Sequence, residues 1–160
     1  MAVICSALGT ALLIILIVLC IPFTLPKVLN YQAYTVVSGS MEPVIPVGSL
    51  VYVKEIPPQE AAAGEVIAYY GSRDNNVIIT HRVLENRVIM GQFITKGDAN
   101  QTEDMNPVKY DHFIGKVTVC IPHGGIAAQI LTSWNGKLAA GGMICVAMLL
   151  HLLAAVWDKK

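Results

Sequence analysis

The segment Ser38-Gly39-Ser40-Met41-Glu42-Pro43 places two serine hydroxyls among turn-forming residues. A serine hydroxyl becomes an effective nucleophile only beside a base, a group that orients this base, and donors for the developing oxyanion. An ordinary surface turn rich in Ser, Gly and Pro explains the same residues. The segment therefore indicates acyl-transfer chemistry only if the chain supplies the other groups.

His81 is the histidine best suited to act as that base. It lies in the β-branched run Val77–Leu84, and strand alternation puts Ile79 and Val83 on its face. An apolar neighbourhood disfavours the charged imidazolium, so we expect a neutral ring that can accept a proton near neutral pH. A half-buried histidine without a catalytic role is the alternative. The remaining histidines lie in less suitable surroundings: His112, His123 and His151.

The segment Lys96–Asp104 (KGDANQTED) carries carboxylates that could orient the histidine. Asp98 and Asp104 are both candidates, and Glu103 is less favoured because no motif places it. A carboxylate bonded to an imidazole fixes the tautomer of the ring and stabilises its protonated form. A solvated acidic loop is the alternative. Together the three segments give the order Ser, His, Asp along one region.

Residues 30–123 are predicted to form one small β-domain that positions these side chains. Two turns are expected between its strands, at Asp74-Asn75-Asn76 and at Glu85-Asn86, since asparagine tolerates left-handed backbone. Six runs rich in β-branched residues predict the strands: Tyr34–Val37, Ser49–Val53, Glu65–Tyr70, Val77–Leu84, Arg87–Lys96 and Phe113–Ile121.

Two apolar segments flank this domain. Residues 1–26 carry no charged side chain and are long enough to cross a bilayer as an N-terminal anchor. A cleavable signal peptide is the alternative, but no basic residue precedes the run and no small-residue cleavage site follows it. Residues 137–157 predict a second transmembrane helix. A short helix at the membrane surface is predicted for residues 126–134, where apolar residues recur at every fourth position.

Positive charge at the C-terminal end of the chain predicts how the protein is oriented in the membrane. Lys159 and Lys160 favour the cytoplasm for the C-terminus, so the β-domain is expected on the outer side. Ser40 follows closely on the first span, which keeps any chemistry there near the outer membrane face. The predicted fold class is therefore mainly β, a compact all-β catalytic domain with two flanking transmembrane helices.

Composition excludes several classes of function. Charged residues make up 14% and hydrophobic residues 54% of the 160 residues, and the formal net charge is zero. A nucleic-acid partner is not expected, because phosphate binding needs a basic patch. No ligand spacing for a metal is present, and no cofactor is expected. The cysteines are predicted to be small apolar side chains rather than disulfides: Cys5, Cys20, Cys120 and Cys145.

Taken in order, three blocks resemble the boxes of type I signal peptidases. The blocks are Ser38–Pro43, Thr80-His81-Arg82-Val83, and Lys96-Gly97-Asp98-Ala99-Asn100 with Asp104 beyond. More narrowly, they resemble the endoplasmic-reticulum-type branch, found also in archaea and some Gram-positive bacteria. Most bacterial members have a lysine base, and His81 matches the histidine of this branch. The resemblance covers roughly residues 34–122.

The resemblance implies roles for five residues. Ser40 would be the nucleophile, His81 the general base and Asp104 the charge-relay aspartate. Asp98 matches the aspartate of the family's Gly-Asp box, with a structural or catalytic role. Ser38 matches a position whose hydroxyl helps the backbone N–H of Ser40 to bind the oxyanion. Two departures leave the division between the aspartates open: Ala99 stands where asparagine is common, and Glu103 replaces the first of two paired acidic residues.

The implied activity is that of a membrane-bound serine endopeptidase that removes signal peptides from secreted preproteins through an acyl-enzyme. Its expected partners are preproteins, the lipid bilayer and accessory subunits like those of multisubunit eukaryotic complexes. The cell membrane is the expected location, with the endoplasmic reticulum membrane as the alternative. The main functional alternative is a non-catalytic, membrane-anchored β-domain that binds a partner. A self-cleaving regulatory protease is disfavoured, because it would pair serine with lysine and carry a DNA-binding domain.

Overall fold

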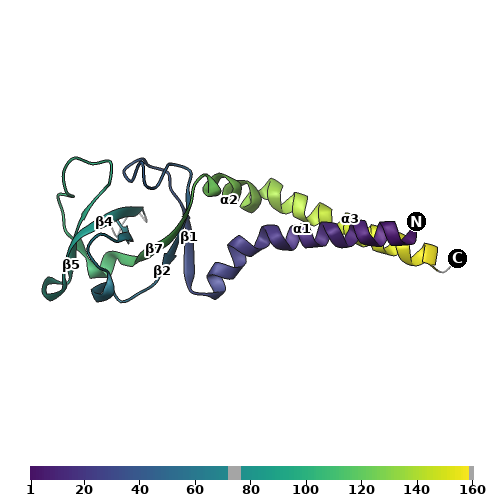
Figure 1. Cartoon of the computed structure of the whole chain (residues 1–160), viewed down its shortest axis with the longest axis horizontal. Helices are drawn as coiled ribbons and strands as arrows, with labels where there is room; N and C mark the ends of the chain where they lie inside the picture. Colours follow the sequence, from purple (N-terminus) through teal and green to yellow (C-terminus); the bar gives the residue numbers. More distant parts are fainter. Residues whose placement is uncertain (72–76, 159–160) are drawn as a thin grey trace. The chain divides into compact units, whose positions relative to one another are not determined.

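A computed structural model of the chain describes residues 1–71 and 77–158 (Figure 1). The chain divides into two compact units. One consists of residues 1–25 and 129–160, and its described residues are mainly helical. The other consists of residues 26–128 and holds the strands. The expected turn at Asp74-Asn75-Asn76 lies outside the described residues.

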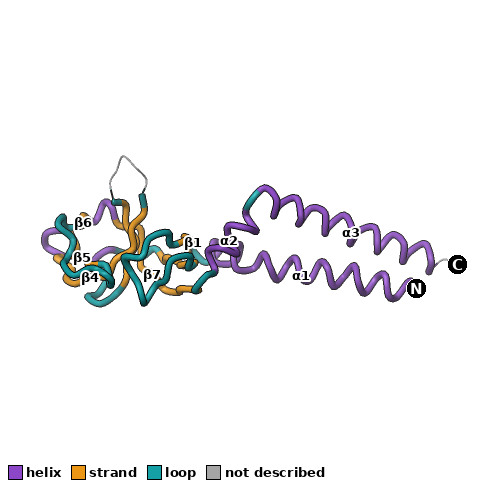
Figure 2. The backbone as a smooth tube through the Cα atoms, turned by 90° about the horizontal axis from the view of Figure 1, so that it is seen from above, coloured by secondary structure: helices purple, strands orange, loops and turns teal. Residues whose placement is uncertain are grey.

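The second unit is built on one seven-stranded antiparallel sheet with the order β1-β2-β7-β3-β4-β5-β6. Its strands are drawn in orange in Figure 2. With an apolar helix at each end of the chain, this sheet confirms the predicted mainly β fold class. The strands are β1 (Tyr31–Thr35), β2 (Leu50–Lys54), β3 (Val66–Tyr70), β4 (Ile78–Arg87), β5 (Gln92–Lys96), β6 (Val108–Lys109) and β7 (Phe113–Ile121).

The turn between β4 and β5 differs from the prediction. β4 continues through Glu85 and Asn86, where a turn was expected, and the chain reverses in a short 3₁₀ segment, Val88–Met90. Gly91 ends this segment with φ 63°, a left-handed conformation that glycine adopts without a steric penalty. The predicted strand Arg87–Lys96 is therefore wrong in its first half, because apolar side chains there form an exposed turn.

Two edge strands also differ from the prediction. β1 begins and ends earlier than the predicted Tyr34–Val37. Val36 lies beyond the strand but still pairs with the chain before β2, since its N–H donates to the Ser49 carbonyl at 2.9 Å. The two-residue strand β6 follows Pro107 and was not predicted.

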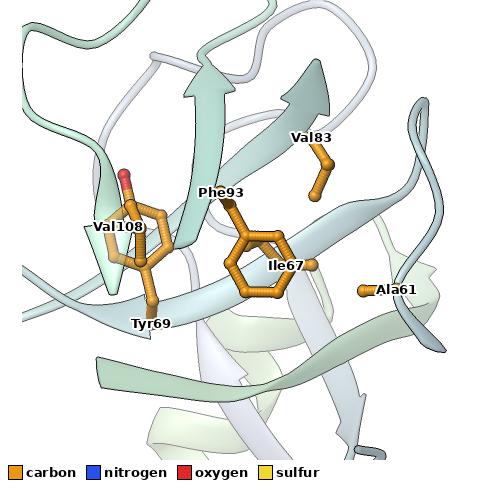
Figure 3. Close-up of a cluster of buried hydrophobic side chains, with 6 residues drawn as sticks. All are labelled: Ala61, Ile67, Tyr69, Val83, Phe93 and Val108. Atoms are coloured by element: carbon orange, nitrogen blue, oxygen red, sulfur yellow. The ribbon is translucent and has the colours of Figure 1, made fainter. Parts of the chain in front are cut away.

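The apolar side chains of the sheet form two main clusters. Residues from β3, β4, β5 and β6 gather around Phe93, which is fully buried (Figure 3). Its members are Ala61, Ile67, Tyr69, Val83, Phe93 and Val108. A second cluster contains Val36, Met41, Ile45 and Val51 and holds the segment after β1 against the sheet.

The described residues also form three α-helices: α1 (Ala2–Val28), α2 (Gly124–Thr132) and α3 (Trp134–Asp158). By length and composition, α1 and α3 are able to cross a membrane. Ser133 separates α2 from α3, and its side-chain oxygen accepts a hydrogen bond from the N–H of Gly136 at 3.2 Å. This is an N-cap, and it explains why α3 begins three residues before the predicted span.

Candidate active site

His81 and Asp104 form a hydrogen-bonded pair. Nδ1 of His81 lies 2.6 Å from Oδ2 of Asp104, and the two side chains are 10% and 20% exposed. A carboxylate at this distance holds the proton on Nδ1 and leaves Nε2 with its lone pair. Of the two candidate aspartates, Asp104 is therefore the one in contact with the histidine.

Asp98 pairs with Arg82 instead. Nε of Arg82 donates to Oδ1 at 2.8 Å and a terminal nitrogen donates to Oδ2 at 2.5 Å, a two-point contact. The third guanidinium nitrogen donates to the Gly64 carbonyl at 2.7 Å. The hydrogen bond to Asp98, together with the negative charge of Asp98, raises the pKa of Arg82 above its ordinary value. Arg82 thus fixes Asp98, and with it the start of the loop that leads to Asp104.

Strand alternation in β4 explains this division. His81 and Arg82 are consecutive in β4, so their side chains leave opposite faces of the sheet. His81 lies opposite Ile67 of β3, and Arg82 lies opposite Lys96 of β5. The loop after β5 therefore carries one aspartate to each of two neighbouring residues of a single strand.

Ser40 lies at the start of the turn that follows β1, where its neighbours fix the backbone. Met41 is fully buried in the second apolar cluster, and its carbonyl accepts the N–H of Ile45 at 2.9 Å. The Ser40 carbonyl accepts the N–H of Ala99 at 2.9 Å. The serine segment and the loop with the aspartates are thus joined directly.

Gly97 separates the backbone of Ser40 from the ring of His81. A Cβ on Gly97 would lie 2.6 Å from the Ser40 carbonyl oxygen and 3.0 Å from Nε2 of His81. The first distance is too short for a real Cβ atom, and the second is a tight contact. Glycine therefore allows the serine segment and the Nε2 side of the imidazole to approach each other closely.

Two clefts border this region. The first, of about 490 Å³, has His81 and Asp104 in its wall together with Tyr69, Met105 and His112. The second, of about 400 Å³, is lined mainly by apolar side chains of the chain around β1 and the start of β4. Ser38 lies in its wall and is exposed to solvent. The structure thus puts Ser38 beside a shallow apolar groove rather than in the protein interior.

Tyr69 and Thr95 belong to the site but were missed from the sequence. The hydroxyl of Thr95 donates to Oδ2 of Asp104 at 2.6 Å, and that of Tyr69 donates to the same atom at 3.2 Å. Burial, with a smaller effect of the negative charge of Asp104, raises the pKa of Tyr69, which stays a neutral donor. The available signal was a hydroxyl-bearing side chain within each of two predicted strands, Thr95 beside Phe93 and Ile94, and Tyr69 after Ile67 and Ala68.

Within residues 1–71 and 77–158, no three metal-ligating side chains of His, Cys, Asp or Glu gather at one place. The hydrogen-bonded pair of His81 and Asp104 is of the kind that supports proton transfer. A mainly β domain that brings a serine segment, a histidine and a paired aspartate together has the composition of a serine-hydrolase site.

Comparison with known proteins finds relatives among the signal peptidases. No protein-family model matches the chain. The chain is 38% identical over 99 residues to signal peptidase I W of Bacillus subtilis, covering 58% of this chain and 50% of that protein. It is 29% identical over 126 residues to the signal peptidase complex catalytic subunit SEC11 of Scheffersomyces stipitis, covering 72% and 75%. The SEC11 subunit of Colletotrichum graminicola is 32% identical over 109 residues, covering 62% and 63%.

The chain is thus related to the type I signal peptidases, including their endoplasmic-reticulum-type branch. The resemblance predicted from the sequence blocks is confirmed. The chain spans half the length of the Bacillus relative that it matches.

Proposed function

We propose that the protein is a membrane-bound serine endopeptidase that removes N-terminal signal peptides from preproteins. The observation that carries this proposal is the pairing of His81 with Asp104, with Nε2 of the ring facing Gly97 and the backbone of Ser40. Relatives named as signal peptidases supply the substrate class.

The proposed reaction proceeds through an acyl-enzyme. Ser40 Oγ attacks the scissile carbonyl while Nε2 of His81 takes its proton, and Asp104 stabilises the resulting imidazolium. The same proton then passes to the leaving amine, and the ring activates a water that hydrolyses the ester. The backbone N–H of Ser40, assisted by the Ser38 hydroxyl, would stabilise the oxyanion. One such donor contributes about 2.7–4 kcal/mol in a comparable site.

The groove beside Ser38 is the proposed binding site for the residues before the scissile bond. It is bordered by the chain from Tyr34 to Ser38 and by residues 77–80. β1 is an edge strand of the sheet, and Val37 beyond it is 85% exposed. An extended peptide can add to such an edge through backbone hydrogen bonds, with small side chains filling the shallow groove.

The proposed setting is a membrane that the chain crosses twice, with the β unit on the outer face. Support comes from two long apolar helices, α1 and α3, and from relatives named as signal peptidases. The cell membrane is proposed, with the endoplasmic reticulum membrane as the alternative. Accessory subunits are a further proposal, because the name of the fungal relatives describes a complex.

The test is cleavage of a preprotein by the purified full chain in detergent, with the cut site read from the new N-terminus. Ser40→Ala and His81→Ala are expected to abolish cleavage while thermal melting stays close to that of the parent protein. Ser6→Ala in α1 is a matched serine control. His123→Asn is a matched histidine control, because asparagine tolerates the left-handed backbone at this position.

Both controls are expected to cleave at the parent rate. A folded, membrane-inserted Ser40→Ala variant that cleaves at the parent rate would disprove the proposal. Absence of cleavage by the folded, membrane-inserted parent protein would favour the non-catalytic, partner-binding alternative.

A further inference from the structure

Oδ2 of Asp104 accepts hydrogen bonds from three side chains. Nδ1 of His81 lies at 2.6 Å, the Thr95 hydroxyl at 2.6 Å and the Tyr69 hydroxyl at 3.2 Å. We propose that Thr95 and Tyr69 are positioning residues that hold the Asp104 carboxylate in line with His81. This inference rests on the proposed function, in which His81 is the base.

The donors lie on paired strands of the sheet. Tyr69, His81 and Thr95 lie on β3, β4 and β5, which are adjacent in the sheet. Alternation places the three side chains on one face, since His81 is opposite Ile67, and Thr95 is opposite Val83. Thr95 is 1% exposed and Tyr69 is 5% exposed. Their hydroxyls are therefore held by strand pairing and core packing.

Asp104 itself lies on a loop and depends on these donors. Its N–H donates to the carbonyl of Thr95 at 2.8 Å, so Thr95 holds both the backbone and the side chain of Asp104. The loop residues 99–103 and Met105 are exposed. Without the Thr95 hydroxyl, the carboxylate would lose the shorter of its two hydroxyl contacts and become free to rotate away from the ring.

The electrostatic effect has a definite sign. A hydroxyl that donates to an ionised carboxylate stabilises and spreads the negative charge. The carboxylate then attracts the proton that lies between it and His81 less strongly. Removing a donor makes the pair more basic, so the acidic limb of the kcat/KM profile moves to higher pH. The other titratable groups facing this pair line the adjacent cleft: Tyr70, Lys109 and His112. They are unchanged in the variants and so do not obscure the shift.

The experiment compares Thr95→Val, Thr95→Ser and Tyr69→Phe in the full chain. Valine keeps the shape of threonine without its hydroxyl, and serine keeps the hydroxyl. We expect Thr95→Val to lower kcat by about ten- to a hundredfold, the effect of one hydrogen bond to a charged group, with KM little changed. Thr95→Ser should recover most of this loss, and Tyr69→Phe should show a smaller loss because its contact is longer.

Thr118→Val is the matched control. Thr118 lies on β7, and its hydroxyl donates at 3.1 Å to the carbonyl of Tyr52 on β2 rather than to Asp104. A purely structural role of Thr95 would lower the amount of active enzyme without moving the acidic limb. The low-field NMR signal of the His81 Nδ1 proton gives a second readout that needs no turnover. It should shift in Thr95→Val and return in Thr95→Ser.

The inference is overturned if Thr95→Val retains the parent kcat and acidic limb, or if serine does not rescue it. In either case, Ser40-dependent cleavage by the parent protein would leave the proposed function intact. Absence of any Ser40-dependent cleavage would overturn both.

Discussion

Oδ2 of Asp104 lies 2.6 Å from Nδ1 of His81. The other aspartate of the same loop, Asp98, is bound by Arg82, the next residue along β4. Two carboxylates six positions apart thus have different partners and are expected to have different functions.

Asp104→Asn and Asp98→Asn separate these functions. Asn at position 104 removes the acceptor charge that stabilises the imidazolium, so turnover should fall by up to about 10⁴-fold, as in a comparable triad, with little change in melting temperature. Asn at position 98 should instead lower the free energy of unfolding by about 1–3 kcal/mol through loss of the charge-assisted pair with Arg82. Preprotein cleavage and thermal melts measure the two effects. If Asp98→Asn were as stable as the parent protein and turned over more slowly than Asp104→Asn, Asp98 and not Asp104 would be the aspartate that serves His81.

Gly97→Ala should abolish cleavage. The new methyl group would lie 2.6 Å from the Ser40 carbonyl, which is backbone and cannot rotate away, and 3.0 Å from Nε2 of His81. The serine segment and the ring are therefore expected to separate. Gly141→Ala is the control, because its Cβ would meet open space in α3. Equal activity of both variants in the preprotein assay would show that the close approach at Gly97 is dispensable.

Met41→Ala should destabilise the β unit and displace Ser40. Met41 is fully buried beside Ile45 and Val51, and truncating such a side chain costs about 2–5 kcal/mol. Met41→Leu conserves volume and should cost less than about 1.5 kcal/mol. Urea denaturation measures both values. A cost for the alanine variant no larger than that for leucine would contradict the anchoring role of Met41.

Glu65→Gln should make stability less dependent on pH. A hydrogen bond from Lys116 is the main cause that lowers the pKa of Glu65 below its ordinary value of 4.5. A lowered folded-state pKa gives stability that is present above the ordinary value and is lost as pH falls through the lowered one. The parent protein should be more stable than the variant at pH 7, and the two should converge in strong acid. Thermal melts of both proteins from pH 7 to strong acid measure this. A difference in stability between parent and variant that does not change with pH would refute the prediction.

The sequence was sufficient to predict the face of His81, because alternation within a β-branched run is a local property. It could not decide between Asp98 and Asp104. Which carboxylate reaches the ring depends on how the loop after β5 returns to β4, and that path is set by tertiary contacts such as the bond from Ala99 to Ser40.

Other features were hidden for similar reasons. Val88, Ile89 and Met90 look like a strand by composition, yet they form an exposed turn that Gly91 closes. Thr95 and Tyr69 were not predicted because a hydroxyl in a strand acquires its partner only when three strands are placed side by side. Hydropathy alone predicted that the second apolar helix begins at residue 137. Ser133 caps α3, which therefore begins at Trp134.

The loop between Asp98 and Asp104 is closed at both ends, by the contacts of Arg82 with Asp98 and of Thr95 with Asp104. Its intervening residues 101–103 are exposed. Lengthening such a loop costs little, about 0.6 kcal/mol for each doubling. A shortened loop, by contrast, would pull one carboxylate away from its partner. The stretch is thus a natural insertion point for an epitope or a fluorophore-binding tag, which would report on the region beside His81 from the solvent side.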